Sequence, residues 1–243
     1  MTSSPTRALS AAAFATLLLI ALLMGANHVA ARLAFNDGVS VPTAVMVRSV
    51  ITALVVGLML LTQRVPLALT PRQRKALPAI GLLIAVQSMC LYAAVARLPV
   101  ALALLVFNSY PLATALWARL LYRHRPERAL LMAMPVILLG LLLALDVLGA
   151  SSGLGAAGQW RSLGLGVGYA LGASLSFGLA LVLTQHEAGG LDGRLRTFTT
   201  MALVGLLAGV GALASGGFVW PSHASGWWGL ALLTLLYGTG ITL

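Results

Sequence analysis

Arg48 is the residue of this sequence whose type and position could do the most specific chemistry. It lies six residues past the start of the apolar segment 42–61, which is about 9 Å along an α-helix. A charge at that depth in lipid costs on the order of 2 kcal/mol or more, so Arg48 should face a cavity or a polar partner. We expect it to attract a carboxylate or phosphate group. The alternatives are snorkelling toward the headgroups and a hydrogen bond between helices.

Asn27 and His28 lie near the end of the apolar segment 11–31 and form a second candidate site. Histidine changes its charge near neutral pH, and no Asp or Glu stands in the middle of an apolar segment. His28 is therefore a candidate for proton coupling. The alternative is a neutral imidazole that donates one hydrogen bond within the protein.

Polar groups in two further apolar segments are candidates for contacting a solute: Gln87, Tyr92, Asn108 and Tyr110. Asn108 shortly precedes Pro111, which removes a backbone hydrogen bond and can kink a helix. Backbone carbonyls freed in this way often bind substrates in transporters. The alternative for each of the four is a hydrogen bond between helices.

Catalytic and cofactor chemistry is not indicated. Cys90 is the only cysteine, so no disulfide can form within the chain, and no His/Cys cluster has metal-ligand spacing. Residues 172–175 resemble the serine motif of an intramembrane protease, but the His residues other than His28 fall in expected loops. The absence of a Gly-Lys-Ser/Thr phosphate loop argues against ATP-driven transport. We therefore expect neither an enzyme nor a cofactor.

Membrane-spanning helices are the elements that must position these groups. Hydrophobic residues make up 60% of the chain and charged residues 8%, which is too few charges to cover a water-facing surface. A helix needs about 20 apolar residues to cross the hydrocarbon core. Eight segments qualify and predict an all-α polytopic bundle: 11–31, 42–61, 78–96, 100–121, 129–148, 163–183, 198–214 and 227–243. Glycines at every fourth position of the sixth segment indicate close helix packing: Gly164, Gly168 and Gly172.

The basic residues predict the orientation. With the N-terminus in the cytoplasm, eleven Lys and Arg residues fall inside and three outside: Arg32, Arg97 and Arg161. We therefore expect a multi-pass protein of the cell (inner) membrane. The net charge of +10 does not indicate a nucleic-acid partner, because the basic residues lie in short gaps between apolar segments. The first segment resembles a signal peptide, but we expect it to remain as an uncleaved helix.

A weak internal repeat divides the chain. At an offset of 148 residues, Arg48 corresponds to Arg196, and the first three segments fall on the last three. Because an offset of five helices is odd, the two halves would insert in opposite orientations, as in many secondary transporters. We predict a first five-helix repeat over residues 1–147, an external flexible link over 148–161 and a second repeat over 162–243.

Four stretches carry a resemblance to the EamA-type transporters of the drug/metabolite transporter superfamily. They are MGANHVA at 24–30, VRS at 47–49, LYAAVARLPVALA at 91–103 and FNSYPL at 107–112. The resemblance implies two five-helix inverted repeats around a central cavity, and it implies a secondary transporter that exports small metabolites such as amino acids or drugs. Tyr169, Ser174 and Tyr237 would then also line the cavity. The partners would be a small-molecule solute and the lipid bilayer, with a homodimer as an open alternative.

The sequence departs from this family pattern in its second half. Only three helices are expected there, so the last two of the family's ten helices have no counterpart. The rival hypothesis is therefore a truncated membrane protein, or a partner subunit, that does not transport. The reading frame downstream of residue 243 would distinguish the two.

Overall fold

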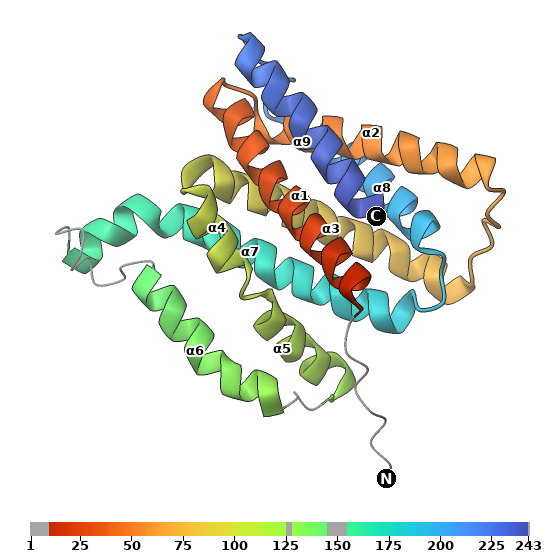
Figure 1. Ribbon diagram of the computed structural model, residues 1–243, viewed down its shortest axis with the longest axis horizontal. Coiled ribbons are helices and arrows are strands. Elements are labelled where there is room, and N and C mark those ends of the chain that lie inside the picture. The colour runs from red at the N-terminus through yellow and green to blue at the C-terminus, as the bar shows by residue number, and fades with distance from the viewer. Residues whose placement is uncertain (1–9, 125–127, 145–154, 243) are drawn as a thin grey trace.

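The computed structural model describes residues 10–124, 128–144 and 155–242, and the regular elements of this part are helices (Figure 1). The expected all-α class is confirmed. The described residues form these elements: α1 (Ala11–Asn36), α2 (Val41–Thr62), α3 (Pro71–Arg97), α4 (Val100–Phe107), α5 (Tyr110–Tyr122), α6 (Arg128–Ala144), α7 (Gly155–Glu187), α8 (Gly193–Ala214) and α9 (Ala224–Thr242).

Six stretches of the described residues are long and apolar enough to cross a membrane, so the molecule is a polytopic helical membrane protein. They are α1, α2, α3, α4 together with α5, Leu163–Glu187 of α7, and α8. The other two expected segments, 129–148 and 227–243, are helical where the structure describes them, in α6 and α9. Neither of these two is among the six stretches.

The fourth traverse is interrupted where the sequence predicts a kink. Helix α4 ends at Phe107 and α5 begins at Tyr110, with Pro111 in the first turn of α5 (Figure 1). Proline has no N–H donor, so it suits the start of a helix and interrupts the interior of one. The tight turn between α3 and α4 at Leu98 and Pro99 also agrees with the sequence.

Two expected boundaries were wrong. Helix α7 already begins at Gly155, so the part of the predicted flexible link over 155–161 is helical, while 148–154 lies outside the described residues. Helix α3 begins at Pro71 and continues through Pro78. The cause at α3 is the capping box of Thr70 and Gln73, in which each side chain bonds the backbone N–H of the other residue.

The loops lie at two opposite ends of the bundle, as expected for helices that cross it in alternating directions. At one end the Arg72 guanidinium pairs with Glu187, and the Tyr122 hydroxyl donates to the same carboxylate at 2.7 Å. Asp37 pairs with the His223 imidazole at 2.7 Å and joins the loops before α2 and before α9 at the other end. We call these the Glu187 end and the Asp37 end. The sequence predicts that the Glu187 end is cytoplasmic.

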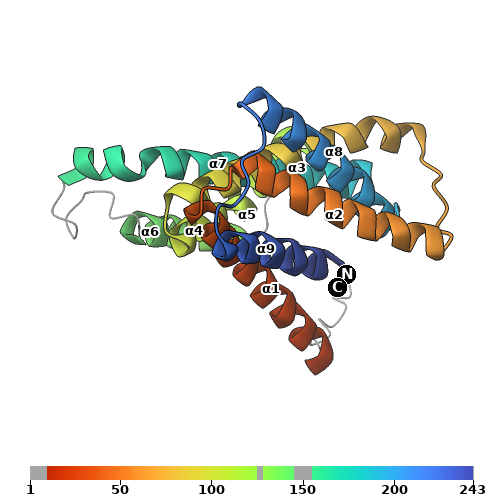
Figure 2. The ribbon, with the colours of Figure 1, turned by 90° about the horizontal axis from the view of Figure 1, so that it is seen from above.

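The helices pack in the pairs that an inverted repeat would produce. The most extensive contacts join α3 to α7, α2 to α8 and α1 to α9. Both views show the α1–α9 pair side by side (Figures 1 and 2). An inverted repeat would make α1, α2 and α3 equivalent to α7, α8 and α9. The α3–α7 contact would then be equivalent to the α9–α1 contact, and the α2–α8 contact would be equivalent to itself.

Two residue contacts between α2 and α8 show the same equivalence. A Cβ atom at Gly57 would lie 2.9 Å from the Phe198 ring, and one at Gly205 would lie 2.8 Å from the Val50 side chain. Gly205 stands 148 residues after Gly57, and Phe198 stands 148 residues after Val50. The offset suggested by the sequence therefore relates two reciprocal contacts across the α2–α8 crossing, although the repeat boundaries remain a prediction.

The glycine stripe on α7 has the expected packing role only at Gly172, where a Cβ atom would lie 3.7 Å from the Cys90 sulfur of α3. A Cβ atom at Gly168 would meet nothing within 4 Å, and one at Gly164 would meet only Trp160 of the same helix. Tight packing of α7 occurs instead at Gly178, where a Cβ atom would lie 2.7 Å from the backbone nitrogen of Thr114 on α5. Spacing along a helix identifies a face but not which face meets a neighbour, and this explains the error.

Candidate functional site

Arg48 lies inside the bundle with 2% of its surface exposed. Its Nη2 donates to the Ser88 hydroxyl at 2.9 Å, and its Nη1 donates to the Tyr92 hydroxyl at 3.3 Å. Ser88 and Tyr92 are one turn apart on α3 and therefore share a face. The remaining guanidinium donor, Nε, is buried without a hydrogen-bond partner. The expected protein partner of Arg48 is thus present, but the expected water-accessible space beside it is closed.

Two tyrosine rings and an amide complete the surroundings of the arginine. The guanidinium carbon lies 3.9 Å from the centroid of the Tyr237 ring on α9 and 4.8 Å from that of Tyr92. The Tyr92 hydroxyl donates to Asn27 Oδ1 on α1 at 3.0 Å. We call Asn27, Arg48, Ser88, Tyr92 and Tyr237 the Arg48 cluster. It joins α1, α2, α3 and α9 through polar contacts in the apolar interior.

No carboxylate among the described residues balances this charge. Asp37, Glu187 and Asp192 all lie at helix ends, and each pairs with a neighbouring base there: His223, Arg72 and Arg194. Among the residues that the structure describes, Arg48 is therefore stabilised by neutral oxygens and aromatic faces alone. A buried cation in that setting is costly in lipid.

The structure brings some of the other candidates to the Arg48 cluster. The Gln87 Oε1 atom accepts a hydrogen bond from the Ser88 hydroxyl at 3.3 Å. The His28 ring lies 5.5 Å from the Tyr92 ring, and its buried Nδ1 has no partner.

Asn108 and Tyr110 lie elsewhere. Asn108 is exposed at the break between α4 and α5, and the Tyr110 ring contacts Phe177 of α7 at a centroid distance of 5.1 Å. Ser174, also on α7, forms a 3.0 Å hydrogen bond with Ser109 between the helices. Tyr110 and Ser174 therefore belong to the α5–α7 interface, and neither they nor Asn108 belong to the Arg48 cluster.

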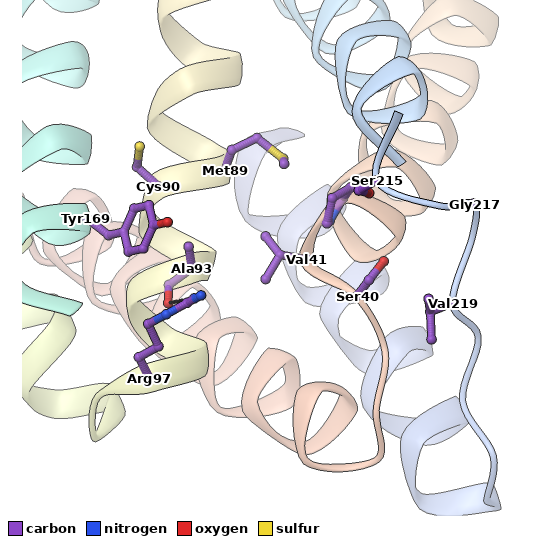
Figure 3. A pocket seen from close by; sticks show the side chains of 11 residues that line it. Ser40, Val41, Met89, Cys90, Ala93, Arg97, Tyr169, Ser215, Gly217 and Val219 are labelled. Atoms are coloured by element: carbon purple, nitrogen blue, oxygen red, sulfur yellow. Dashed lines mark hydrogen bonds between the residues drawn. The ribbon is translucent and has the colours of Figure 1, made fainter. Parts of the chain in front are cut away.

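Sequence reasoning missed Ser88, although its position one turn before Tyr92 was a usable signal. It also missed a cavity of about 450 Å³ at the Asp37 end (Figure 3). Its lining comes from α2, α3, α7 and the end of α8: Ser40, Val41, Pro42, Met89, Cys90, Ala93, Arg97, Tyr169, Ser215, Gly217 and Val219. Arg97 lies over the Tyr169 ring at 4.9 Å.

The cavity adjoins the core that holds Arg48. Val41 and Met89 line the cavity, and both also pack against the hydrophobic cluster that contains Tyr92. The cavity and the Arg48 cluster therefore border the same hydrophobic core.

A bundle of apolar helices with a buried cation and an adjoining cavity defines a membrane protein built around an internal polar site. The chain belongs to the EamA-like transporter family, whose family model matches residues 11–145, more than half of the sequence. It is thus a membrane transporter of the drug/metabolite transporter superfamily. Four of the five members of the Arg48 cluster lie in the matched part. A comparison with curated proteins found no match.

Proposed function

We propose that this protein is a secondary carrier that exports small metabolites and binds its solute at the Arg48 cluster. The observation that carries the proposal is the buried, uncompensated guanidinium of Arg48. Intramembrane charges are costly and mark substrate or ion pathways in membrane proteins. A cation held only by neutral groups can exchange those partners for groups of a solute without leaving another charge unpaired.

The two ends of the bundle support transport by alternating access. The cavity of about 450 Å³ lies at the Asp37 end. At the Glu187 end, hydrogen bonds to one carboxylate connect α3, α5 and α7. We propose that rocking of the two inverted repeats, residues 1–147 and 162–243, opens one end while it closes the other.

Transport by the full chain in proteoliposomes tests this function. Vesicles loaded with a mixture of amino acids and small organic acids are diluted, and the released compounds are identified by mass spectrometry. We expect selective release compared with empty vesicles, and we expect loss of that release in Arg48→Gln. Absence of release by a chain that is folded and inserted would refute the proposal and favour the non-transporting alternative.

A further inference from the structure

The charge balance around Arg48 points to the chemical class of the solute. Arg48 carries the one fixed charge of its cluster, and the Asp and Glu residues that the structure describes are paired at the helix ends. Resting on the function proposed above, we propose that the transported solute is a monoanion whose carboxylate pairs with Arg48. One negative charge neutralises the site, whereas a neutral solute leaves the buried cation as costly as before.

The hydrogen bonds of Arg48 leave one of its donors available to such a ligand. Nε has no partner, and the two Nη atoms donate to neutral hydroxyl oxygens at 2.9 and 3.3 Å. A carboxylate accepts two parallel N–H bonds from a guanidinium, and these charge-assisted bonds are about twice as strong as bonds between neutral groups. A carboxylate that binds Nε and one Nη therefore satisfies the orphaned donor and replaces a weaker neutral partner.

The charges and hydrogen-bond acceptors around Arg48 also disfavour zwitterionic and cationic solutes. An ammonium group beside the cluster would meet neutral acceptors alone among the described residues, namely Asn27 Oδ1, Gln87 Oε1 and the unpartnered Nδ1 of His28, together with a guanidinium of the same sign. The aromatic faces of Tyr92 and Tyr237 are occupied by Arg48. An amino acid would thus bury its ammonium without a countercharge, and a dianionic phosphate would bury one excess negative charge. A carboxylate that lacks an amine fits best.

The neighbouring cavity agrees in size and access. Its volume of about 450 Å³ is within the range of small-molecule sites, roughly 300–1,000 Å³. Val41 and Met89 line this cavity and also pack against the hydrophobic core that contains Tyr92, so a small organic acid there would border the core that holds the Arg48 cluster.

A matched series of probes tests the charge class. The purified full chain is titrated with 3-phenylpropionate, phenylalanine, 2-phenylethylamine and 2-phenylethyl phosphate, and with hexanoate, norleucine and hexylamine as the aliphatic set. Binding is read from the change in melting temperature. We expect at least one carboxylate to bind about tenfold or more tightly than its zwitterionic, cationic and phosphate counterparts. Tighter binding of any of those counterparts, or no binding of either carboxylate at about 10 mM, which corresponds to less than about 3 kcal/mol of binding free energy, would overturn the inference.

Variants of the chain separate the arginine from general electrostatics. Arg48→Gln should weaken carboxylate binding about tenfold or more, and Arg48→Lys should retain part of it because the charge stays while the two-pronged geometry is lost. Arg119→Gln, which removes an equal charge from the exposed end of α5, should bind as the native chain does. Carboxylate binding that survives Arg48→Gln would sink the inference. Release of amines or zwitterions from vesicles would refute the proposal of a monoanionic solute but not the proposed transport function. If no compound were released, the proposed transport function would be refuted.

Discussion

Gly178→Ala should weaken the bundle by separating α5 from α7. A Cβ atom there would lie 2.7 Å from the Thr114 nitrogen and 2.9 Å from both the Ala113 carbonyl carbon and its Cβ. Carbon atoms in favourable contact are about 3.5–4.0 Å apart, so the helices must part by about 1 Å at this point. Backbone atoms cannot rotate away as a side chain can. Overpacking of this kind costs about 1–3 kcal/mol.

Gly168→Ala on the same helix is the matched control. A Cβ atom at Gly168 would meet nothing within 4 Å, so this substitution adds the helix propensity of alanine, up to about 1 kcal/mol, without a clash. Because both variants gain that propensity, the difference between them isolates the steric cost. At about 2–4 °C per kcal/mol for a chain of this size, Gly178→Ala should melt about 2–12 °C below Gly168→Ala.

Thermal denaturation of both variants in the same detergent, followed by size-exclusion chromatography with fluorescence detection, measures this difference. The native chain should melt between the two variants or close to Gly168→Ala. If Gly178→Ala melts at the same temperature as Gly168→Ala, then α5 does not approach α7 as closely as described, and the assignment of Gly178 as the packing glycine is wrong.

Three further predictions concern topology, access and pH. Reporter fusions after Lys75 and after Gly155 should give opposite signals, because the two sites are expected on opposite sides of the membrane; equal signals would contradict the predicted orientation. Cys90 lines the cavity at the Asp37 end, so a small membrane-impermeant maleimide added outside the cell should label it, and Gly172→Val, which adds bulk 3.7 Å from its sulfur, should slow that labelling. Hydrogen bonds from the His223 backbone N–H and imidazole lower the pKa of Asp37. The ionised Asp37 carboxylate therefore stabilises the fold above the ordinary aspartate pKa, and this stabilisation is lost as the pH falls through the lowered pKa of the folded protein. Asp37→Asn should therefore remove part of the acid sensitivity of hydrogen exchange in the loop before α9, and an unchanged acid profile would argue against this link.

The helices and several of their ends could be predicted from the sequence because lipid imposes a simple rule. An apolar segment of sufficient length must satisfy its own backbone hydrogen bonds, and this requirement favours a helix wherever such a segment occurs. The break at Asn108 and the turn at Leu98 followed from proline chemistry. The start of α7 at Gly155 did not follow, because a glycine-rich and serine-rich stretch resembles a linker until it extends an adjoining helix.

The site was only partly predictable because it depends on helix rotation. Arg48 stood out by its charge alone, and its burial agrees with that expectation. Asn108 and Tyr110 were equally polar, yet the structure leaves Asn108 exposed at the helix break and places Tyr110 against Phe177 of α7. Ser88 stands one turn before Tyr92 in an apolar segment, and its role became evident only through its 2.9 Å contact with Arg48. Which polar residues share one interior point is decided by how each helix turns toward its neighbours.

The reciprocal contacts of Gly57 with Phe198 and of Gly205 with Val50 have a mechanical meaning. They centre the relation between the two halves on the crossing of α2 and α8. In the rocking motion proposed above, displacement would grow with distance from the rotation axis and would be smallest at the α2–α8 crossing, which would act as the pivot. Arg48 stands two residues before Val50, close to this pivot. A carboxylate held there would keep a nearly constant depth in the membrane while the two mouths of the bundle exchange places as the open one.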